Sequence, residues 1–433
     1  MEEQGKISFL TAVLMNINVI VGVGIYFMPQ LMVQTAGAFS FLGWVAAGLL
    51  LLPIVWTIAT AARLFPGAGG FYNYGSSGLN TTAGFTAVWV YMLGFLAVAA
   101  TQLTFLKQLM AVNGGFAWVM AMPIMANMIF VMAIALLNLF DVRLIGKIQG
   151  VATILKLLPM IGVILAFAFY WNSGLEYKIS DLAQIGVTVP MALFGYWGFE
   201  SCTSTSHLIQ GGSTRAAGVM LTAFFASVSL YALFHFGIIH IMGIGAVAAQ
   251  GAVGFVNFLG FNPNITNLLG FSVIAALMLA LFNAVYGVSL ANSANMFSLA
   301  DKNHLIASKM LCTMNKNGRP YIIVFFQALI VFLLMTFVAN DKVLLSLSNF
   351  GLITAMVISI LAVLKTQTTR KLGCFGQLIS LVALAACGVL FYYSWLAIGA
   401  DTTDRLINIA PFVVGLIGGL IMFCAKKGCK SVC

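Results

Sequence analysis

Long apolar runs recur along the entire chain, and they limit the fold more strongly than any other feature of the sequence. A run of roughly 18 or more apolar residues can cross the hydrocarbon core of a bilayer as a helix. Hydrophobic residues make up 62% of the 433 residues and charged residues only 7%, which excludes an ordinary soluble domain. We identify about twelve such runs, near residues 9–34, 40–62, 82–112, 116–139, 148–171, 186–209, 217–243, 266–297, 320–338, 343–364, 374–397 and 406–425.

The chain is therefore expected to be an all-α polytopic membrane protein with about twelve transmembrane helices. A single membrane domain is expected to cover residues 1–433. The segment 243–270 is rich in glycine and less apolar, so we treat it as a loop. The first run is too long for the apolar part of a signal peptide and has no obvious cleavage site, so no cleaved signal peptide is expected.

Positive charge is distributed unevenly between the connections. The basic residues Lys178, Lys342 and Arg405 fall in connections on one side, and Lys107 and Lys156 fall inside runs. All the others of the 20 Lys and Arg lie on the side of both termini. Basic residues concentrate on the cytoplasmic side of membrane proteins, so we place both termini in the cytoplasm and the protein in the plasma or inner membrane. The net charge of +10 then reflects topology and anionic lipid rather than nucleic-acid binding.

Two of the runs contain glycines at mid-membrane depth. Gly22 and Gly24 interrupt the first run, and Gly195 and Gly198 interrupt the sixth. Glycine weakens a helix, and unsatisfied backbone groups are costly in a bilayer. The two broken runs are five runs apart. Since five is an odd number of membrane crossings, a repeated five-helix unit would enter the membrane from the opposite side the second time. We expect repeats at about 9–171 and about 186–364, with extra helices at about 374–425.

A broken helix in a membrane can serve as a binding site. The N–H groups and positive dipole end of its second half suit a carboxylate, and the free carbonyls of its first half suit an ammonium group. An α-amino acid carries both groups. The alternative is that the glycines only allow close helix packing. The presence of the pattern in two matched runs favours a binding site.

Several motifs, in chain order, resemble those of the amino acid–polyamine–organocation (APC) transporters. Gly22-Val-Gly-Ile-Tyr-Phe-Met-Pro29 resembles their Gly-Ser-Gly-Ile-Phe-x-x-Pro, and Gly198-Phe-Glu200 matches their Gly-Phe-Glu in span six. The other matching segments are Pro66–Tyr74, Gln149–Pro159, Ala300–Ile306 and Asn317–Pro320. The pattern is most similar to that of the arginine/agmatine-type antiporters.

The resemblance implies a LeuT-like fold of five plus five inverted helices and two C-terminal helices. It also implies an amino acid or amine substrate between broken spans one and six. The residues expected to bind substrate are Gly22, Val23, Gly24, Phe95, Gln102, Phe194, Gly195, Trp197, Gly198 and Tyr286. Phe194 and Val288 stand where the antiporters have tryptophan, so arginine is not the expected substrate. Phe95, Phe194 and Tyr286 instead suggest a roomy, mainly apolar pocket.

Two charged residues inside the runs are candidates for gating or proton coupling. Glu200 needs a partner or a proton because a buried, unpaired carboxylate is costly; the alternative is a structural cap that accepts backbone N–H groups. Lys156 lies about 12 Å into span five. In some APC transporters a lysine here stands where sodium symporters of the same fold hold a cation, and it would tie span five to broken span one. The alternative is a side chain that snorkels to the interface, as we expect of Lys107.

The expected function is secondary active transport of an amino acid or related amine by alternating access, as proton-coupled symport of a neutral or aromatic amino acid. The alternative is amino acid/amine exchange of the arginine/agmatine type. An intramembrane enzyme would need clustered His, Asp, Cys or Ser–His machinery, and a channel would need charge rings or a filter. The sequence shows neither pattern. The expected partners are the substrate, protons and the bilayer, with an oligomer left open.

The remaining titratable residues suggest no cofactor or metal site. His207 is interpreted as a structural imidazole. His235 and His240 are about 140° apart around a helix, so they do not share a face. The seven cysteines are interpreted as free thiols.

Overall fold

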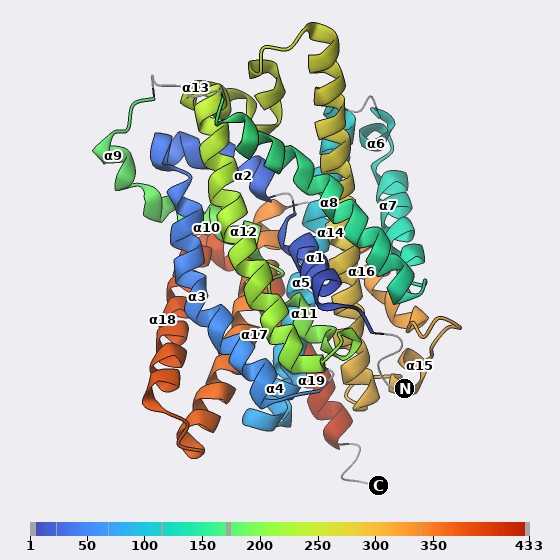
Figure 1. Cartoon of the computed structure of the whole chain (residues 1–433). Helices are drawn as coiled ribbons and strands as arrows, with labels where there is room; N and C mark the ends of the chain where they lie inside the picture. The colour runs from blue at the N-terminus through green and yellow to red at the C-terminus, as the bar shows by residue number, and fades with distance from the viewer. Residues whose placement is uncertain are drawn as a thin grey trace.

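The protein is a helix bundle (Figure 1). Its computed structural model describes residues 6–22, 24–67, 69–113, 116–169, 175–338 and 340–428. Within these ranges the backbone is almost entirely helical, and its only strand-like pairing is an isolated parallel bridge between Ile7 and Ile209. The expectation of an all-α membrane protein is confirmed.

The elements, of which those marked η are 3-10 helices, are α1 (Phe9–Ile20), α2 (Gly24–Ala36), η1 (Gly37–Phe39), α3 (Leu42–Leu64), α4 (Phe71–Gly78), α5 (Thr81–Asn113), α6 (Trp118–Ala121), α7 (Pro123–Leu137), α8 (Val142–Ala166), α9 (Ile179–Leu182), α10 (Ile185–Tyr196), α11 (Ser201–Ser204), η2 (Ser206–Leu208), α12 (Gly212–Met242), α13 (Ile244–Gln250), η3 (Ala252–Phe258), α14 (Pro263–Asp301), α15 (Ser308–Leu311), α16 (Tyr321–Phe337), α17 (Asp341–Thr369), α18 (Cys374–Ala397) and α19 (Thr402–Gly428).

Eight helices in the described part of the chain are long and apolar enough to cross a membrane, namely α3, α5, α8, α12, α14, α17, α18 and α19. The pair α1 and α2, bent by 45°, makes a ninth if it is one span. The helices α7 and α16 are apolar but shorter, with 15 and 17 residues. The sixth apolar run is divided between α10 and α11. The protein is an integral membrane protein, and the number of twelve spans stays a prediction.

The expectation of a loop over 243–270 is wrong. This segment contains α13, η3 and the first turns of α14. Gly243, Gly251 and Gly260 separate these pieces, with φ values of 80°, 69° and 68°. A positive φ favours glycine and ends a right-handed helix. The glycines therefore divide this segment into short helices instead of leaving it without structure.

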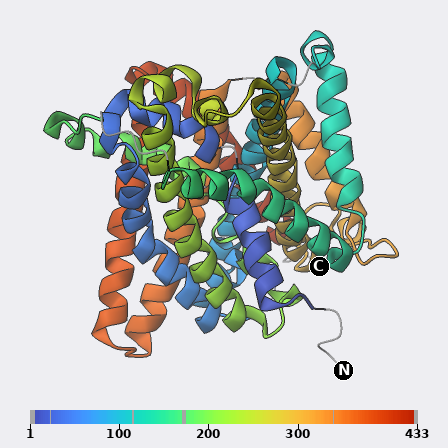
Figure 2. The same cartoon turned by 45° about the horizontal axis from the view of Figure 1, so that its top comes forward.

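The helix α1 lies in the middle of the bundle, in contact with α8, α12 and α14 (Figure 1). The start of α1 and the end of α19 lie towards the same end of the bundle, and α13 and α6 lie at the opposite end (Figures 1 and 2). The helix α2 packs against α10. The two interrupted runs, far apart in sequence, are thus neighbours in space.

The pair α5 and α17 makes the most extensive helix–helix contact of the described bundle. A Cβ atom added to Gly351 on α17 would lie 3.1 Å from the Cα atom of Gly94 on α5. A Cβ atom added to Gly94 would lie 3.1 Å from the Ser348 carbonyl oxygen. Small residues allow helix backbones in a membrane to approach this closely.

We expect Gly351→Leu to lower the thermal unfolding midpoint of the purified protein, because the added side chain forces α17 away from α5. Overpacking of this kind costs about 1–3 kcal/mol. The matched control is Gly388→Leu on α18, where an added Cβ atom has no neighbour within 4 Å. Equal midpoints for the two variants in detergent would show that the contact between α5 and α17 tolerates a side chain.

Candidate functional site

The breaks of the first and sixth runs lie against each other. A Cβ atom added to Gly24 would lie 2.9 Å from the Cα atom of Gly195. Gly198 has a φ of +107°, and its added Cβ atom would lie 3.2 Å from the carbonyl oxygen of Val19. Glycine is required at Gly198 both by this backbone conformation and by the close approach. The structure therefore brings Gly24, Gly195 and Gly198 together, as a shared site requires.

The carbonyl groups at the end of α1 find partners outside their own helix. The last carbonyls of a helix have no intrahelical donor. The ammonium group of Lys156 on α8 donates to the Asn18 carbonyl at 2.7 Å, to the Asn18 side-chain oxygen at 2.5 Å and to the Val21 carbonyl at 2.7 Å. The negative end of the α1 dipole also favours a cation here. Lys156 thus joins α8 to the first break.

The side chain of Lys156 is fully buried, with 0% of its surface exposed, so it does not reach the membrane interface. The Asn18 side-chain oxygen that it contacts also accepts a hydrogen bond from Asn283 on α14, at 2.8 Å. Asn18 in turn donates to the Asn283 carbonyl at 3.0 Å. These contacts connect α1, α8 and α14 through polar groups at the depth of the break.

A tyrosine that the sequence did not indicate joins both breaks. The hydroxyl of Tyr231 on α12 lies 2.9 Å from the carbonyl oxygen of Ile20 and 3.0 Å from that of Gly195. One hydroxyl has one proton to donate, so the two carbonyls share it. Nothing in the sequence distinguishes Tyr231 from any other aromatic residue of a membrane helix.

Asn16 on α1 caps the start of α11, and the sequence analysis missed it too. Its side-chain oxygen accepts from the Ser201 hydroxyl at 2.8 Å and from the backbone N–H of Cys202 at 3.2 Å. Its amide nitrogen donates to the Phe199 carbonyl at 2.8 Å. A signal was available, since Asn16 and Asn18 are uncharged polar residues in a strongly apolar run, where an unpaired amide is costly.

Glu200 lies at the second break and is fully buried. It makes no side-chain capping bond to α11, so the role of cap falls to Asn16. Neither carboxyl oxygen of Glu200 has a hydrogen-bond partner among the described residues. The Tyr91 hydroxyl on α5 lies close enough to interact with it electrostatically. The hydroxyls of Thr203 and Ser204 nearby in sequence are likewise buried without partners.

Gln102 and Phe95 on α5 border the site from one side. A Cβ atom added to Gly22 would lie 3.1 Å from the Gln102 amide nitrogen, and the Gln102 carbonyl oxygen is buried without a partner among the described residues. Phe95 is fully buried, and its ring centroid is 4.4 Å from that of Tyr91. Phe194 lies beside Gly24, with a ring carbon 3.6 Å from the added Cβ atom.

Other predicted site residues are placed differently. The Trp197 indole nitrogen donates to the side chain of Asn349 on α17 at 2.7 Å. Tyr286 on α14 is buried and interacts electrostatically with Arg319, which lies just before α16. Val23 lies outside the described residues.

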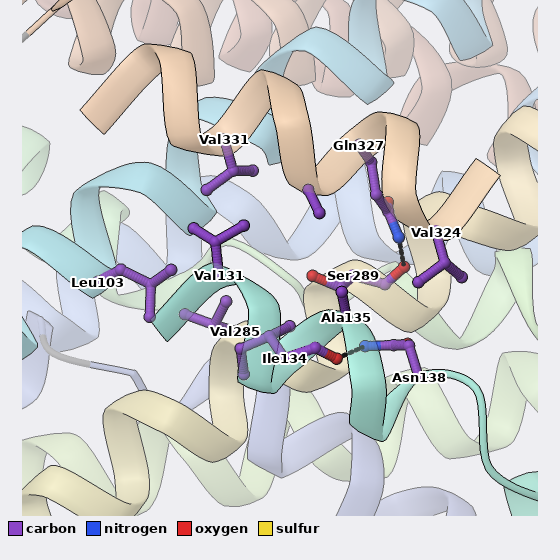
Figure 3. A pocket seen from close by; sticks show the side chains of 11 residues that line it. Leu103, Val131, Ile134, Ala135, Asn138, Val285, Ser289, Val324, Gln327 and Val331 are labelled. Atoms are coloured by element: carbon purple, nitrogen blue, oxygen red, sulfur yellow. Dashed lines mark hydrogen bonds between the residues drawn. The ribbon is translucent and has the colours of Figure 1, made fainter. Parts of the chain in front are cut away.

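The space around the breaks is small. A cavity of about 20 Å³ lies beside the first half of α1 and is lined by Asn16, Val19, Gln149 and Gly287 among others. A cavity of about 10 Å³ lies between α5, α7, α14 and α16 (Figure 3). A cavity needs roughly 10–15 Å³ to hold one water molecule, so neither admits an amino acid. The conformation is closed around these cavities.

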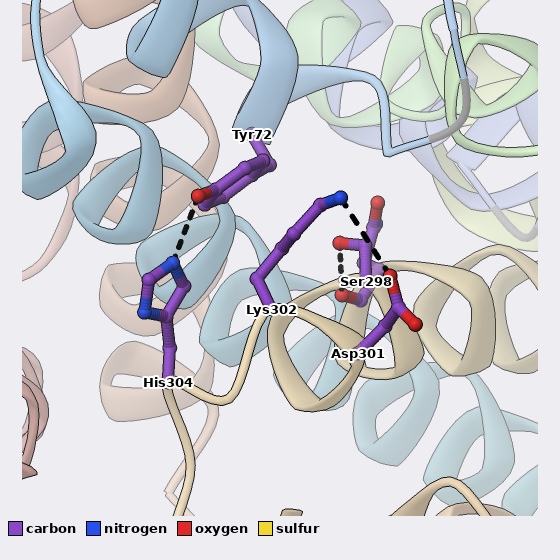
Figure 4. Close-up of polar contacts among 6 residues, drawn as sticks. Tyr72, Ser298, Asp301, Lys302 and His304 are labelled. Atoms are coloured by element: carbon purple, nitrogen blue, oxygen red, sulfur yellow. Dashed lines mark hydrogen bonds and ion pairs between the residues drawn. The ribbon is translucent and has the colours of Figure 1, made fainter.

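Several contacts close the end of the bundle at which α1 starts. The backbone of Ile7 accepts from Gln210 at 3.0 Å and donates to Leu208 at 2.8 Å. At the same end the Tyr72 hydroxyl on α4 lies 2.8 Å from an imidazole nitrogen of His304, beyond α14 (Figure 4). Lys302 and Asp301 form an exposed ion pair beside them at 3.7 Å (Figure 4).

The sequence profile of a family described as amino acid permease matches residues 7–418, nearly the entire chain. The chain belongs to the amino acid permease family. The predicted membership of the APC superfamily is thereby confirmed, and the specific similarity to arginine/agmatine antiporters stays a prediction. The permease is an amino acid transporter, as expected, and the members of its family are transporters rather than enzymes.

Curated relatives align with the permease at low identity over most of its length. The serine/threonine exchanger SteT of Bacillus subtilis is 22% identical over 98% of the permease and 97% of its own chain. The gamma-aminobutyric acid permease of the same bacterium is 21% identical over 94% and 90%. The aromatic amino acid transport protein AroP of Escherichia coli K12 is 22% identical over 79% and 75%.

We expect Gly24→Leu to weaken the binding of all substrates by a similar factor, because the new side chain would occupy the contact between the two breaks. The control is Gly270→Leu on α14, where an added Cβ atom has no neighbour within 4 Å. Binding of labelled amino acids to both variants, checked for folding by gel filtration, measures the effect. Unchanged affinity in folded Gly24→Leu protein would place the binding site elsewhere.

Proposed function

We propose that the permease carries a neutral or aromatic amino acid across the membrane by alternating access, coupled to a proton through Lys156. The observation that supports this most directly is the position of the Lys156 ammonium group, buried against two carbonyls at the end of α1. In this proposal, substrate binding and the protonation of Lys156 both change the stability of the same broken helix.

The substrate backbone is proposed to bind at the two breaks. The first N–H groups of α2 have no acceptor inside their helix, and they lie at the positive end of its dipole, which favours the substrate carboxylate. The substrate ammonium group would take the carbonyl side of the breaks, near Gly195 and Gly198. Main-chain recognition of this kind, proposed for Gly22, Val23 and Gly24, is independent of the substrate side chain.

The side chain of the substrate is proposed to face Phe95 and Phe194. These rings present apolar surface, and the amide of Gln102 beside Gly22 offers an unused carbonyl oxygen. Among these three side chains there is no carboxylate. A buried guanidinium group without a partner costs several kcal/mol, so the site favours uncharged side chains. In this proposal Trp197 and Tyr286 line the edge of the pocket.

The proton coupling follows from a count of donors. A protonated lysine has three N–H donors, and Lys156 uses them on three oxygen atoms of Asn18 and Val21. A neutral amine has two N–H groups, so loss of the proton removes one of these three hydrogen bonds. The link between α8 and α1 then weakens, and the balance between the two faces of the transporter shifts. Glu200, whose buried carboxyl oxygens have no hydrogen-bond partner within the described part of the chain, is the alternative proton carrier.

Exchange is the second candidate function. SteT, which aligns with 98% of the permease, is a serine/threonine exchanger. An exchanger would use the same breaks for both amino acids and would change face only when loaded. The two possibilities differ in whether internal amino acid or a proton gradient drives uptake.

The topology that accompanies this proposal has both termini in the cytoplasm, as the distribution of basic residues indicates. The two inverted repeats are proposed to cover about 9–171 and about 186–364, with extra helices at about 374–425. The contact between the two breaks is what such a repeat predicts, because each repeat contributes one broken helix.

We expect Lys156→Met to abolish the dependence of uptake on a pH gradient, because methionine keeps the volume but has no proton to release. In proteoliposomes, wild-type protein should accumulate labelled substrate faster when the outer solution is more acidic than the lumen. Glu200→Gln, measured separately, tests whether Glu200 is the proton carrier instead. The control is Lys147→Met, which removes an exposed lysine of the same helix. Full, normally pH-dependent uptake by Lys156→Met would rule out the coupling proposal.

We expect a panel of labelled amino acids to show uptake of neutral or aromatic members and weak uptake of arginine, since the proposed pocket offers a guanidinium no carboxylate. The panel is measured with and without internal unlabelled amino acid and a pH gradient. Uptake that needs internal amino acid and ignores pH would establish exchange. Arginine as the sole tight substrate would contradict the proposed pocket.

A further inference from the structure

A second buried lysine lies away from the breaks, near the end of the bundle opposite the start of α1. Lys107 on α5 is only 7% exposed, so its side chain is largely enclosed by the protein. Its ammonium group donates to the side-chain oxygen of Asn127 on α7 at 2.9 Å. The Asn127 amide nitrogen donates to the hydroxyl of Thr336 on α16 at 3.2 Å. Three helices thus meet at one cation.

The charge of Lys107 is not compensated by the described side chains. The ion pairs found among them, Lys178 with Glu176 and Lys302 with Asp301, lie elsewhere. Lys107 uses one of its three N–H donors on Asn127, and Thr336 still has a hydroxyl proton to donate. An ammonium group at membrane depth without an anion is costly. The cluster therefore offers several unused donors to a negatively charged group.

An apolar groove lies on the surface near this cluster, between α7 and α16, and holds about 270 Å³. Its walls include Met128, Met132, Phe325, Ala328, Leu329 and Phe332. Met128 and Leu329 are each 53% exposed. The groove itself is apolar, and the charged cluster lies about one helical turn beyond it.

Helix spacing places the cluster and the groove on the same helix faces. Residues four apart in a helix lie one above the other, so Val131, another wall residue, lies below Asn127, and Phe332 lies below Thr336. Thr336 is one residue from the end of α16, and Phe325 lies about 16 Å deeper at 1.5 Å per residue. The cation is therefore at the depth of lipid headgroups, and the groove is at the depth of acyl chains.

We propose that this groove is a binding site for one anionic phospholipid, with its phosphate on Lys107 and Thr336 and an acyl chain between α7 and α16. The charge of the cluster favours an anionic lipid over a zwitterionic one, whose own cation competes with Lys107 for the phosphate. The bound lipid joins α5, α7 and α16 on the face away from α1. This site is separate from the substrate site and does not depend on the proposed coupling.

The test uses full-length, delipidated protein in a neutral detergent, titrated with phosphatidylglycerol or with phosphatidylcholine of the same acyl chains. Native mass spectrometry counts bound lipids, and the thermal unfolding midpoint reports stabilisation. We expect one phosphatidylglycerol to bind about 10-fold more tightly than phosphatidylcholine, in line with a charge-assisted hydrogen bond. Lys107→Met should remove this preference, and Lys107→Arg should retain it. Lys178→Met, which removes an exposed lysine, should leave it unchanged.

A second variant tests the groove itself. Ala328→Phe fills the groove without changing the cluster, and it should weaken the binding of both lipids. Persistence of the phosphatidylglycerol preference in Lys107→Met would overturn the proposal, as would unchanged binding by Ala328→Phe. If free glycerol phosphate, which has no acyl chain, competes as tightly as the lipid binds, the groove plays no part. If the protein is a dimer and Ala328→Phe dissociates it, the groove binds a second copy of the chain, and the lipid proposal is overturned.

Discussion

The site depends on how the protein satisfies the carbonyl groups at the end of a helix that stops inside the membrane. A helix end leaves carbonyls without donors, and in hydrocarbon each costs several kcal/mol. Here the donors are the Lys156 ammonium group, on Asn18 and Val21, and the Tyr231 hydroxyl, on Ile20. These donors come from α8 and α12, so the broken helix is stable only while both helices are in place. A movement of α8 or α12 therefore changes the energy of the break directly.

The second break depends on the first for its own hydrogen bonds. Tyr231 also donates to the Gly195 carbonyl, and Asn16 of α1 bonds the Phe199 carbonyl and caps the start of α11. Gly24 and Gly198 then allow the two backbones to touch. Because Asn16 bonds the second break from α1 and Tyr231 contacts carbonyls of both breaks, the two breaks are linked by hydrogen bonds. The cavity of about 20 Å³ beside Asn16, Val19 and Ser201 is too small to hold an amino acid.

The sequence predicted the features that follow from local rules. Apolar runs indicated the membrane helices and glycines indicated the two breaks, whereas Lys156 became a candidate partner of the first break through the resemblance to APC transporters. Asn16 and Tyr231 were missed because their importance comes from which carbonyls they face, and that depends on helix packing. The short helices within 243–270 were missed because hydropathy averaged over a membrane span hides elements of seven residues. The role of Tyr286 was inferred from position alone and stays a prediction.

The bridge between Ile7 and Ile209 closes the bundle where α1 begins, and its two hydrogen bonds run between main-chain atoms of Ile7, Leu208 and Gln210. A contact of this kind constrains the path of the chain but not the identity of its side chains. Relatives that share only about a fifth of their residues with the permease can therefore form the same closure with other amino acids. Separation of the two segments breaks both backbone hydrogen bonds of Ile7, and the freed N–H and C=O groups then need other partners, of which water is the simplest.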